Sequence, residues 1–500
     1  MFQPIHNKSK EKLTSYEEAI FSLNGLQGNS AKAARVRQEV KRDRKRAQEE
    51  LKSQLSFIGL NQDDISNLKV IHVAGTKGKG STCAFTEAIL RVHGLKTGLF
   101  SSPHLIEVRE RIRINGDPLS KDQFVRYFWD VYNKLKIKED ILLMPGYFAF
   151  LSLMAYHTFI QEQVDVAIIE VGIGGEYDST NIIEKPAVIG ISSLGIDHTG
   201  YLGKTIEEIA WHKAGIFKPN IPSFSVPQPK EGMQILRERA YAIKAPLFLA
   251  LPLELYEWED TIGPLGIEGA VQKCNASLAI QLACTWLNGK EDTNEVEFNS
   301  SKFSTNEDLP LPSAPLFTIS RKFAEGLANC RWPGRCQTVI CKQTVYCLDG
   351  AHTKDSILNC AEWFGVTAQR YPNLTKVLVF NCVGGRHADI LLSHLCTYNF
   401  NIALFSPNSI DTVQIATSDQ AKFKADYETA DDGQLDICIS NLNLWNHMTN
   451  DVPCESRSFP CLRAACDYLT TLPPSLVLVT GSLKLVGAVL SLVAPESVLL

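Results

Sequence analysis

The sequence lacks the patterns that direct a chain into or across a membrane. No apolar run reaches the roughly 18 residues that a membrane-spanning helix needs. The N-terminal residues contain neither the apolar core of a signal peptide nor the arginine-rich amphipathic pattern of a strong transit peptide. We therefore expect a cytoplasmic protein without a membrane-spanning segment, for which a mitochondrial pool stays open.

Metal-binding spacings and a strong charge of one sign are also missing. The 14 cysteines and 11 histidines are scattered without a C-x-x-C or H-E-x-x-H pattern, so we interpret the cysteines as reduced. The net charge of −5 gives no general attraction for nucleic acid, and we expect no nucleic-acid partner. Mixed charges over residues 31–55 indicate a solvated helix face rather than a nucleic-acid arm.

The length of 500 residues predicts two or three domains. From residue 68 onward, short β-branched runs alternate with helical segments, which is typical of a doubly wound α/β domain with a parallel sheet. A polar stretch over 288–315 indicates a linker, and a second α/β series follows it. We expect one domain over residues 1–315 and another over 316–500. Within the second, the stretch 409–457 is polar and has no steady hydrophobic period, and is interpreted as a partly mobile excursion.

A glycine-rich loop follows an apolar, β-rich run. The run Val70–Ala74 predicts a strand, the loop is Gly75–Ser81 (GTKGKGS), and residues 82–90 are typical of a helix. Glycines let backbone N–H groups converge on phosphate oxygens, and the helix N-terminus adds its positive dipole end. Lys79 supplies a cation, and Ser81 supplies a hydroxyl for a phosphate or Mg²⁺. The spacing differs from a standard P-loop and a plain tight turn is the alternative, but the strand context favours nucleotide binding.

Three further polar residues follow predicted strands. Ser102 comes after one strand, Glu170 ends the apolar run Val164–Ile169, and His198 follows the next strand. Ligands bind at the carboxyl ends of parallel strands, so these side chains would meet beside the glycine-rich loop. A hydroxyl, a carboxylate and an imidazole can bind a divalent cation. Singly, each has an ordinary structural interpretation; together they favour a metal site.

Lys213 and two second-domain segments allow both structural and functional interpretations. The capping box Thr205–Glu208 opens a helix that places Lys213 in its last turn, where the helix dipole alone favours a lysine. Arg335 lies in a Pro-Gly turn and could bind phosphate through its guanidinium. Asp349 and His352 follow a predicted strand, where an aspartate can accept hydrogen bonds from a ribose or form an Asx-turn.

Nine segments carry a resemblance to a known family, in that family's order from about residue 16 to about residue 490. They are His72–Thr82, Ser101–Leu105, Arg109–Gly116, Glu170–Gly175, Ser192–Thr199, Lys213–Lys218, Trp332–Arg335, Leu348–Thr353 and Val479–Leu483. These strings resemble folylpolyglutamate synthase of the eukaryotic type, a member of the Mur ligase group. Several of them are not shared by generic nucleotide-binding proteins.

The resemblance implies an N-terminal P-loop ATPase domain with a mainly parallel sheet and a C-terminal Rossmann-like α/β domain. It implies ATP-dependent addition of L-glutamate to the γ-carboxylate of tetrahydrofolate (poly)glutamates, through an acyl-phosphate intermediate. The expected cofactors are ATP and Mg²⁺, and a monovalent cation such as K⁺ is allowed. The expected partners are the folate and L-glutamate substrates, with the chain acting as a monomer.

The resemblance also assigns roles to individual residues. ATP would contact Gly78, Lys79, Gly80, Ser81, Arg335, Asp349 and His352. Mg²⁺ would be bound by Ser102, Glu170 and His198. Lys213 resembles the lysine that is carbamylated in this group, which would supply a carboxylate for a second Mg²⁺ and overrides its structural interpretation. The catalytic residues would then be Lys79, Lys213 and Arg335.

Departures from the family pattern leave rival functions open. Ala149 stands where arginine is common, and Val383 and His387 replace a threonine and an aspartate, which puts substrate preference or domain contacts in doubt. The nearest rival is a dihydrofolate synthase, which joins glutamate to dihydropteroate, or a bifunctional enzyme. A P-loop switch protein is disfavoured because no Asn-Lys-x-Asp guanine signature exists. A folate-binding pseudoenzyme is disfavoured because the ATP and Mg²⁺ residues are present.

Overall fold

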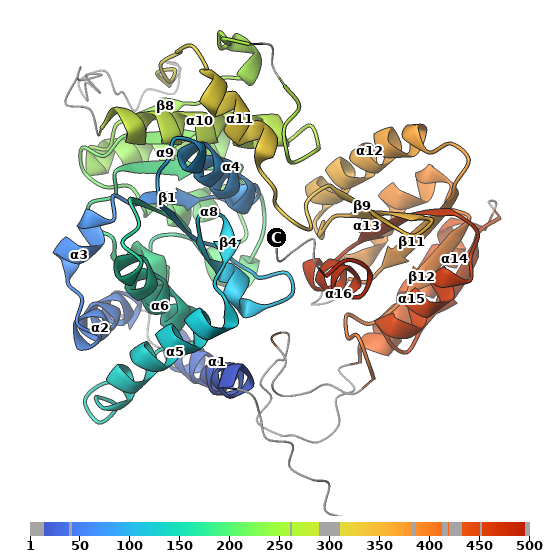
Figure 1. The fold of residues 1–500 in the computed structure, drawn as a ribbon, viewed down its shortest axis with the longest axis horizontal. Helices are drawn as coiled ribbons and strands as arrows, with labels where there is room; N and C mark the ends of the chain where they lie inside the picture. The colour runs from blue at the N-terminus through green and yellow to red at the C-terminus, as the bar shows by residue number, and fades with distance from the viewer. Residues whose placement is uncertain are drawn as a thin grey trace, which may run out of the picture.

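The structure, a computed structural model, describes residues 15–39, 43–260, 263–289, 311–382, 387–412, 419, 433–450 and 453–495. Two α/β domains lie side by side, the first coloured blue to yellow and the second orange to red (Figure 1). Each domain is built on one sheet with mainly parallel strands. The predicted fold class is confirmed.

The first sheet places the glycine-rich loop at its centre. Its strands run in the order β4-β3-β2-β5-β1-β6-β7-β8, parallel except for the β2–β3–β4 edge. They are β1 Ile71–Ala74, β2 Thr97–Phe100, β3 Ile112–Ile114, β4 Asp117–Pro118, β5 Val166–Glu170, β6 Val188–Ile191, β7 Ser223–Ser225 and β8 Leu247–Leu249. Every residue of β1 is buried, because helices cover both faces of the sheet.

Helices pack on this sheet through three apolar clusters. One cluster joins α1, α2, α5 and α6, a second joins α4, α10 and α11, and a third joins α8 and α9. The helices of this domain are α1 Ser15–Glu39, α2 Asp43–Phe57, α3 Gln62–Asn67, α4 Lys79–Val92, α5 Lys121–Lys136, α6 Tyr147–Gln161, α7 Thr199–Leu202, α8 Ile206–Ala214, α9 Lys230–Ile243, α10 Gln272–Asn288 and α11 Arg321–Asn329. None of the helices in the described part of the chain combines the length and apolarity that crossing a membrane requires.

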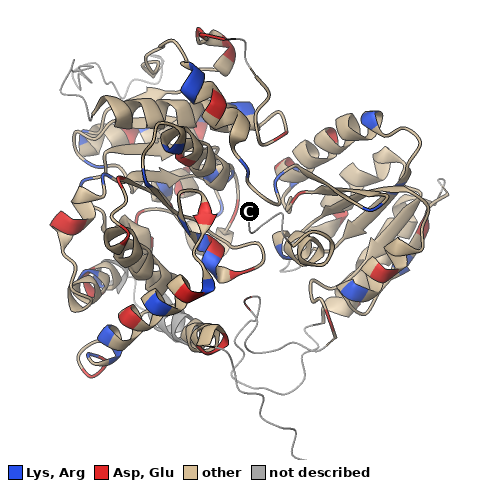
Figure 2. Cartoon of the chain, viewed as in Figure 1, with Lys and Arg blue, Asp and Glu red and all other residues tan. Residues whose placement is uncertain are grey.

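The second sheet has the order β13-β12-β11-β14-β10-β9, and only β9 runs antiparallel to its neighbour. Its strands are β9 Gln337–Cys341, β10 Thr344–Leu348, β11 Thr375–Phe380, β12 Ile402–Phe405, β13 Glu455–Ser458 and β14 Ser475–Thr480. The helices are α12 Lys354–Arg370, α13 Ala388–Leu395, α14 Gln434–Met448, α15 Leu462–Thr470 and α16 Leu483–Val493. Helix α16 faces the first domain (Figure 1). In Figure 2, positive and negative residues are interspersed over both domains.

The stretch 409–457, interpreted as a partly mobile excursion, contains a helix and a strand in its second half that the sequence did not predict. Helix α14 buries Cys438, Asn441 and Trp445, one side chain per turn, against the second sheet. Strand β13 is an edge strand with the polar sequence ESRS, so it has no apolar alternation to reveal it. Both elements were missed because the apolar content of this segment is small and widely spaced.

Helix α11 connects the two domains and packs on the first. It follows the linker expected over 288–315, of which residues 290–310 lie outside the described part of the chain. Phe323 and Leu327 join the apolar cluster of α4. Gly326 allows close approach, since a Cβ there would lie 2.6 Å from the Cα of Ile89 on α4. The division of the chain at residue 315 stays a prediction; in the structure, the chain passes to the second sheet between α11 and β9.

We predict that His72, on β1, makes stability depend on pH. Burial, with a smaller contribution from the charge of Lys218, lowers the pKa of His72 to about 3. The unfolded chain binds a proton near the ordinary pKa of about 6.5, so acid favours unfolding. This contribution to stability is complete above pH 6.5 and is lost as the pH falls toward 3, by about 1.4 kcal/mol per pH unit.

Urea unfolding at several pH values between neutral and pH 5 tests this prediction. His72→Gln should flatten the acid-side fall in the free energy of unfolding, whereas the exposed His447→Gln should leave it unchanged. An equal fall in wild type and His72→Gln would contradict the role of His72.

Candidate active site

The glycine-rich loop forms a tight connection between β1 and α4. Backbone N–H groups of Thr76 and Lys77 donate to the carbonyl of Ser193, which ties the loop to the end of β6. Gly78 caps α4 with φ of 85°, a left-handed conformation that favours glycine. A Cβ on Gly78 would lie 2.1 Å from Oδ1 of Asn275, so no other residue fits there. The predicted strand, loop and helix are confirmed, and α4 begins at Lys79, earlier than residue 82.

Lys79, Glu170 and Ser102 meet at the ends of their strands. The Nζ of Lys79 lies 3.9 Å from Oε1 of Glu170, and the backbone N–H of Ser102 donates to Oε2 over 3.0 Å. Burial raises the pKa of the Glu170 carboxyl, against the charge of Lys79 and the hydrogen bond from Ser102. A buried carboxylate that faces a phosphate-type loop is a group that a bound cation would stabilise.

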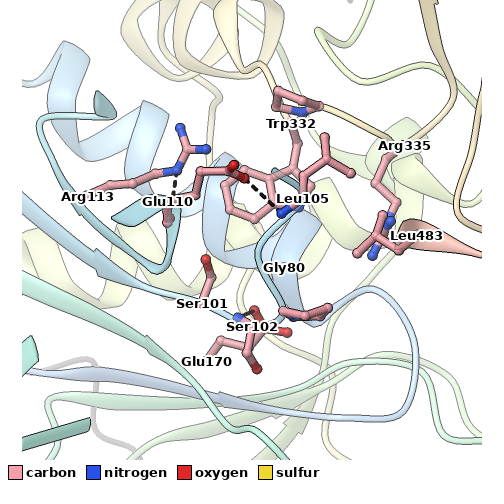
Figure 3. Close-up of a pocket in the computed structure, with 12 residues that line it drawn as sticks. Gly80, Ser101, Ser102, Leu105, Glu110, Arg113, Glu170, Trp332, Arg335 and Leu483 are labelled. Atoms are coloured by element: carbon pink, nitrogen blue, oxygen red, sulfur yellow. Dashed lines mark hydrogen bonds between the residues drawn. The ribbon is translucent and has the colours of Figure 1, made fainter. Parts of the chain in front are cut away.

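A pocket opens beside these groups, between the two domains (Figure 3). Ser101, Ser102 and Glu170 lie on one side of it, while Trp332 and Arg335 approach from the segment that leads to the second domain. The lining residues are Gly80, Ser101, Ser102, Pro103, Leu105, Glu110, Arg113, Glu170, Trp332, Pro333, Arg335 and Leu483. The structure thus brings the loop, two of the predicted metal ligands and Arg335 to one pocket.

Lys213 reaches the same loop from α8. The predicted capping box is confirmed, since the side chain of Thr205 accepts the N–H of Glu208. Lys213 is only 3% exposed, and its Nζ donates to the carbonyl of Gly75 over 2.7 Å. Burial, with repulsion from Lys79, lowers the pKa of Lys213 well below its ordinary value. A buried neutral amine beside the loop is the state that reacts with CO₂.

His198 follows β6 and precedes the short helix α7. It is an exposed residue at the start of α7, with φ of 51°, and its backbone N–H donates to Oδ1 of Asp197. Partial desolvation of the ring, with repulsion from Lys79 and Lys213, lowers the pKa of His198, although Asp197 opposes the shift. In the part of the chain that the structure describes, no group of three His, Cys, Asp or Glu side chains is close enough to hold a metal. The metal assignment of His198 stays a prediction.

Arg335 lies in a turn whose backbone is hydrogen-bonded to the carboxylate of Asp349. Cys336 has φ of 42°, an unusual left-handed conformation for a residue with a side chain. The N–H of Cys336 donates to Oδ2 of Asp349 over 2.8 Å, and the N–H of Ala351 donates to Oδ1 over 2.9 Å. Burial raises the pKa of Asp349. Its carboxylate therefore fixes the backbone next to Arg335, and its predicted contact with ATP stays a prediction.

His352 contacts the glycine-rich loop across the domain boundary. Its Nε2 lies 3.2 Å from Nζ of Lys77, which also lies 3.0 Å from Oδ2 of Asp197. Burial opposes ionisation of Asp197, but the neighbouring His352 and the charge of Lys77 hold the pKa of Asp197 below its ordinary value. Sequence reasoning missed this pairing. The only signal was that Lys77 is a second lysine in the loop and that Asp197 follows a strand.

Asn275 and Trp332 also contact the loop and were missed. Asn275, near the start of α10, lies against Gly78. The indole Nε1 of Trp332 lies 3.0 Å from a Cβ built on Gly80, and the guanidinium of Arg113 stacks on the indole ring at 5.1 Å. Trp332 belongs to a segment that the sequence singled out only for its arginine, whereas nothing in the sequence marks Asn275.

Two of the three departures from the family pattern can be placed. Ala149 lies on α6 and packs against the apolar cluster of the first domain. His387 is exposed at the start of α13, with its Nδ1 3.9 Å from Oδ1 of Asp389. Val383 lies outside the described residues.

A phosphate-type loop at the end of a central parallel strand faces, across one pocket, an arginine from the segment that enters a second α/β domain. This combination defines a two-domain P-loop ligase. No family model matches the chain, but curated proteins and solved structures do.

The chain is 44% identical over 452 residues to the mitochondrial folylpolyglutamate synthase of Homo sapiens, covering 88% of this chain and 75% of that protein. It is 40% identical over 551 aligned residues to the mitochondrial folylpolyglutamate synthase of Bos taurus, covering 96% and 92%. The solved Mycobacterium tuberculosis folylpolyglutamate synthase complexed with ADP shares the fold, with a TM-score of 0.65 and 22% identity over 88% of this chain and 94% of that one. The chain belongs to the folylpolyglutamate synthase family.

Proposed function

We propose that this protein uses ATP to add L-glutamate to the γ-carboxylate of a tetrahydrofolate or its polyglutamates. The observation that carries the proposal is the pocket itself, which Gly80, Ser102 and Glu170 of the first domain line together with Arg335 (Figure 3). The family supports this reaction, since the relatives are named for folate and glutamate, and one solved relative is named as an ADP complex.

The chemistry explains why such a pocket is needed. A carboxylate resists attack by an amine, so the γ-phosphoryl of ATP is first transferred to it, and the bond to ADP breaks as the acyl phosphate forms. The amine of glutamate then attacks the carbonyl carbon, and the tetrahedral intermediate expels phosphate and leaves an amide. Lys79 and Arg335 offset the charge of the transferred group. Closure of both domains keeps water from the acyl phosphate.

Mg²⁺ fits the residues at the strand ends. Glu170 supplies a buried carboxylate, Ser102 lies against it, and His198 would complete the protein ligands. When bound, Mg²⁺ would neutralise charge on the phosphates. A carbamate on Lys213 would supply the ligand for a second Mg²⁺. A monovalent cation such as K⁺ belongs to the proposal only through the family resemblance.

Within this proposal the second domain contributes more than one ATP contact. Arg335 and Asp349 would act from the second domain, and His352 would approach the phosphates beside Lys77. The nucleotide would rest on residues Gly78–Ser81 of the first domain, with Ser81 buried at the start of α4. Measuring the ATP affinity of single variants of these residues tests which of them contact the nucleotide.

We predict that Arg335→Ala lowers kcat about a hundredfold, with a smaller change in ATP affinity. The P-loop and Mg²⁺ hold ground-state ATP, so the guanidinium contributes most as phosphoryl charge redistributes. Loss of a charge-assisted bidentate contact in a dry cleft costs on the order of 3 kcal/mol. Arg335→Lys should rescue poorly because the fork geometry is lost. A variant with normal kcat and only a raised KM for ATP would contradict this role.

The remaining parts of the proposal concern assembly and location. We expect the protein to act as a monomer, as the family resemblance implies. The names of the mammalian relatives support a mitochondrial pool beside the expected cytoplasmic one. Light scattering and subcellular fractionation test these two expectations.

ADP release tests the function directly. The purified protein should release ADP with tetrahydrofolate and glutamate together, and little with either omitted. Release with dihydropteroate and glutamate alone would replace the proposed function by dihydrofolate synthase, and release with both acceptors would make the enzyme bifunctional. Release that does not depend on any acceptor would contradict a ligase.

A further inference from the structure

The glycine-rich loop contains two lysines that point to different partners. The Nζ of Lys79 lies 3.9 Å from Oε1 of Glu170, a residue that lines the pocket. Lys77 instead lies between Asp197 of the first domain, at 3.0 Å, and His352 of the second, at 3.2 Å. Phosphate binding by the loop accounts for Lys79 and leaves Lys77 without an assigned role.

The groups around Lys77 are only partly buried, so they form a contact that solvent can compete with. The side chains of Lys77, Asp197 and His352 are 31%, 21% and 26% exposed. Burial, with repulsion from Lys79 and Arg335, lowers the pKa of Lys77, while Asp197 opposes the shift. Asp197 thus helps to keep the Lys77 ammonium charged where it meets His352.

From His352, hydrogen bonds continue to Arg335 inside the second domain. The Nδ1 of His352 lies 3.0 Å from the carbonyl of Gly350, and a carbonyl only accepts, so Nδ1 carries the proton. The N–H of Gly350 donates to the carbonyl of Gly334 over 3.2 Å. Nη1 of Arg335 donates to that same carbonyl over 3.1 Å. Lys77, His352, Gly350, Gly334 and Arg335 therefore form one continuous chain of polar contacts.

The backbone along this chain has little freedom to absorb a shift. A Cβ on Gly350 would lie 3.0 Å from Nη1 of Arg335, so the guanidinium packs directly on this residue. Gly334 has φ of 76°, and the next residues are fixed by Asp349 as described above. A movement of the His352 segment relative to the loop would displace the guanidinium with it.

We infer that Lys77 is a positioning residue, which sets the place of Arg335 by holding the His352 segment against the loop. The inference rests on the proposed function, because the position of Arg335 matters only if Arg335 acts on the transferred phosphoryl group. In this arrangement Lys77 acts through Arg335 and not by its own contact with phosphate.

A double-variant comparison separates these two roles. Lys77→Met should lower kcat roughly tenfold, the effect of losing about 1.4 kcal/mol, with a smaller change in ATP affinity. Lys77→Arg should restore part of the loss, because a guanidinium also reaches Asp197. Lys77→Met combined with Arg335→Ala should be no slower than Arg335→Ala alone. Multiplied losses in the double variant would show that Lys77 acts independently, and would overturn the inference.

Hydrogen–deuterium exchange tests the inference without measuring activity. It also shows whether a variant has lost activity because it is misfolded. In Lys77→Met, backbone amides of residues 350–353 should exchange with deuterium faster than in wild type, while those of α4 should not change. The matched control is Lys52→Met, which removes another ion pair of the first domain, with Glu184 at 2.6 Å, and should alter neither exchange nor kcat. Unchanged exchange at 350–353 would overturn the inference.

The failures of the two proposals differ. If the wild-type protein does not release ADP with folate and glutamate, the proposed function fails. If the wild type is active but Lys77 and Arg335 contribute independently, only the positioning role fails.

Discussion

Lys79→Ala is expected to abolish ligation while the fold survives. Lys79 is the first residue of α4, which follows the central strand β1, and its Nζ lies 3.9 Å from Oε1 of Glu170. An arginine that stabilises the charge of a transferred phosphoryl group contributes on the order of 10³- to 10⁵-fold in kcat, and we expect a loss of that order when the Lys79 cation is removed. The ADP-release assay measures the loss, and thermal unfolding checks the fold.

The cost of this substitution to stability should be small. Lys79 stands 3.9 Å from Glu170, a weak ion pair, and burial already raises the pKa of the Glu170 carboxyl, so this group can bind a proton when its partner is removed. Lys204→Ala, an exposed lysine before α8, is the matched control and should keep full activity. Turnover of Lys79→Ala within a few-fold of wild type would remove Lys79 from the site.

Lys213→Ala should also lose most activity, on the order of a thousandfold. This follows if the carbamate of wild-type Lys213 binds a second Mg²⁺ that lowers the free energy of the transition state by several kcal/mol. The lowered pKa of Lys213 favours the neutral amine, which attacks CO₂; a C–N bond forms, one C=O electron pair moves to oxygen, and the amine proton passes to water. Acid protonates the amine and reverses the reaction, so the carbamate is lost as the pH falls. Small carboxylates should partly restore activity to Lys213→Ala.

Carbon-13 NMR with labelled bicarbonate measures the modification itself. A carbamate signal should appear in the wild type and be absent in Lys213→Ala. Lys218→Ala is the control, because Lys218 also has a pKa lowered by burial, but its Nζ donates to Oδ1 of Asn181, away from the loop. A signal that persists in Lys213→Ala, or that never appears, would contradict carbamylation.

The sequence predicted the loop because everything that the loop requires is local. A β-branched run, two glycines without room for a side chain and a following helix are all readable within about twenty residues. Ser102 and Glu170 were placed together by a rule of topology, since both follow parallel strands next to each other in the sheet.

The contacts that the sequence did not predict join distant segments through geometry alone. Lys77 meets His352 across 275 positions of the chain, and Asn275 reaches the loop from the other end of the first domain. The Asx-turn that the sequence allowed for Asp349 is present, since its carboxylate accepts the N–H of Ala351, but the second bond, from the N–H of Cys336 beside Arg335, was not predicted. Neither residue type nor spacing distinguishes a side chain that touches a ligand from one that holds its neighbour.

The close packing of α11 on α4 fixes where a rotation of the second domain would have its pivot. Gly326 locks this helix to the one that begins at the nucleotide loop, so the free part of the connection is short and lies beside Arg335. Rotation moves each atom in proportion to its distance from the pivot. In such a rotation the arginine would travel through a small arc, while the far rim of the second sheet, with β12 and β13, would sweep a wide one. The entrance would then widen for a bulky acceptor while the guanidinium stayed near the glycine-rich loop.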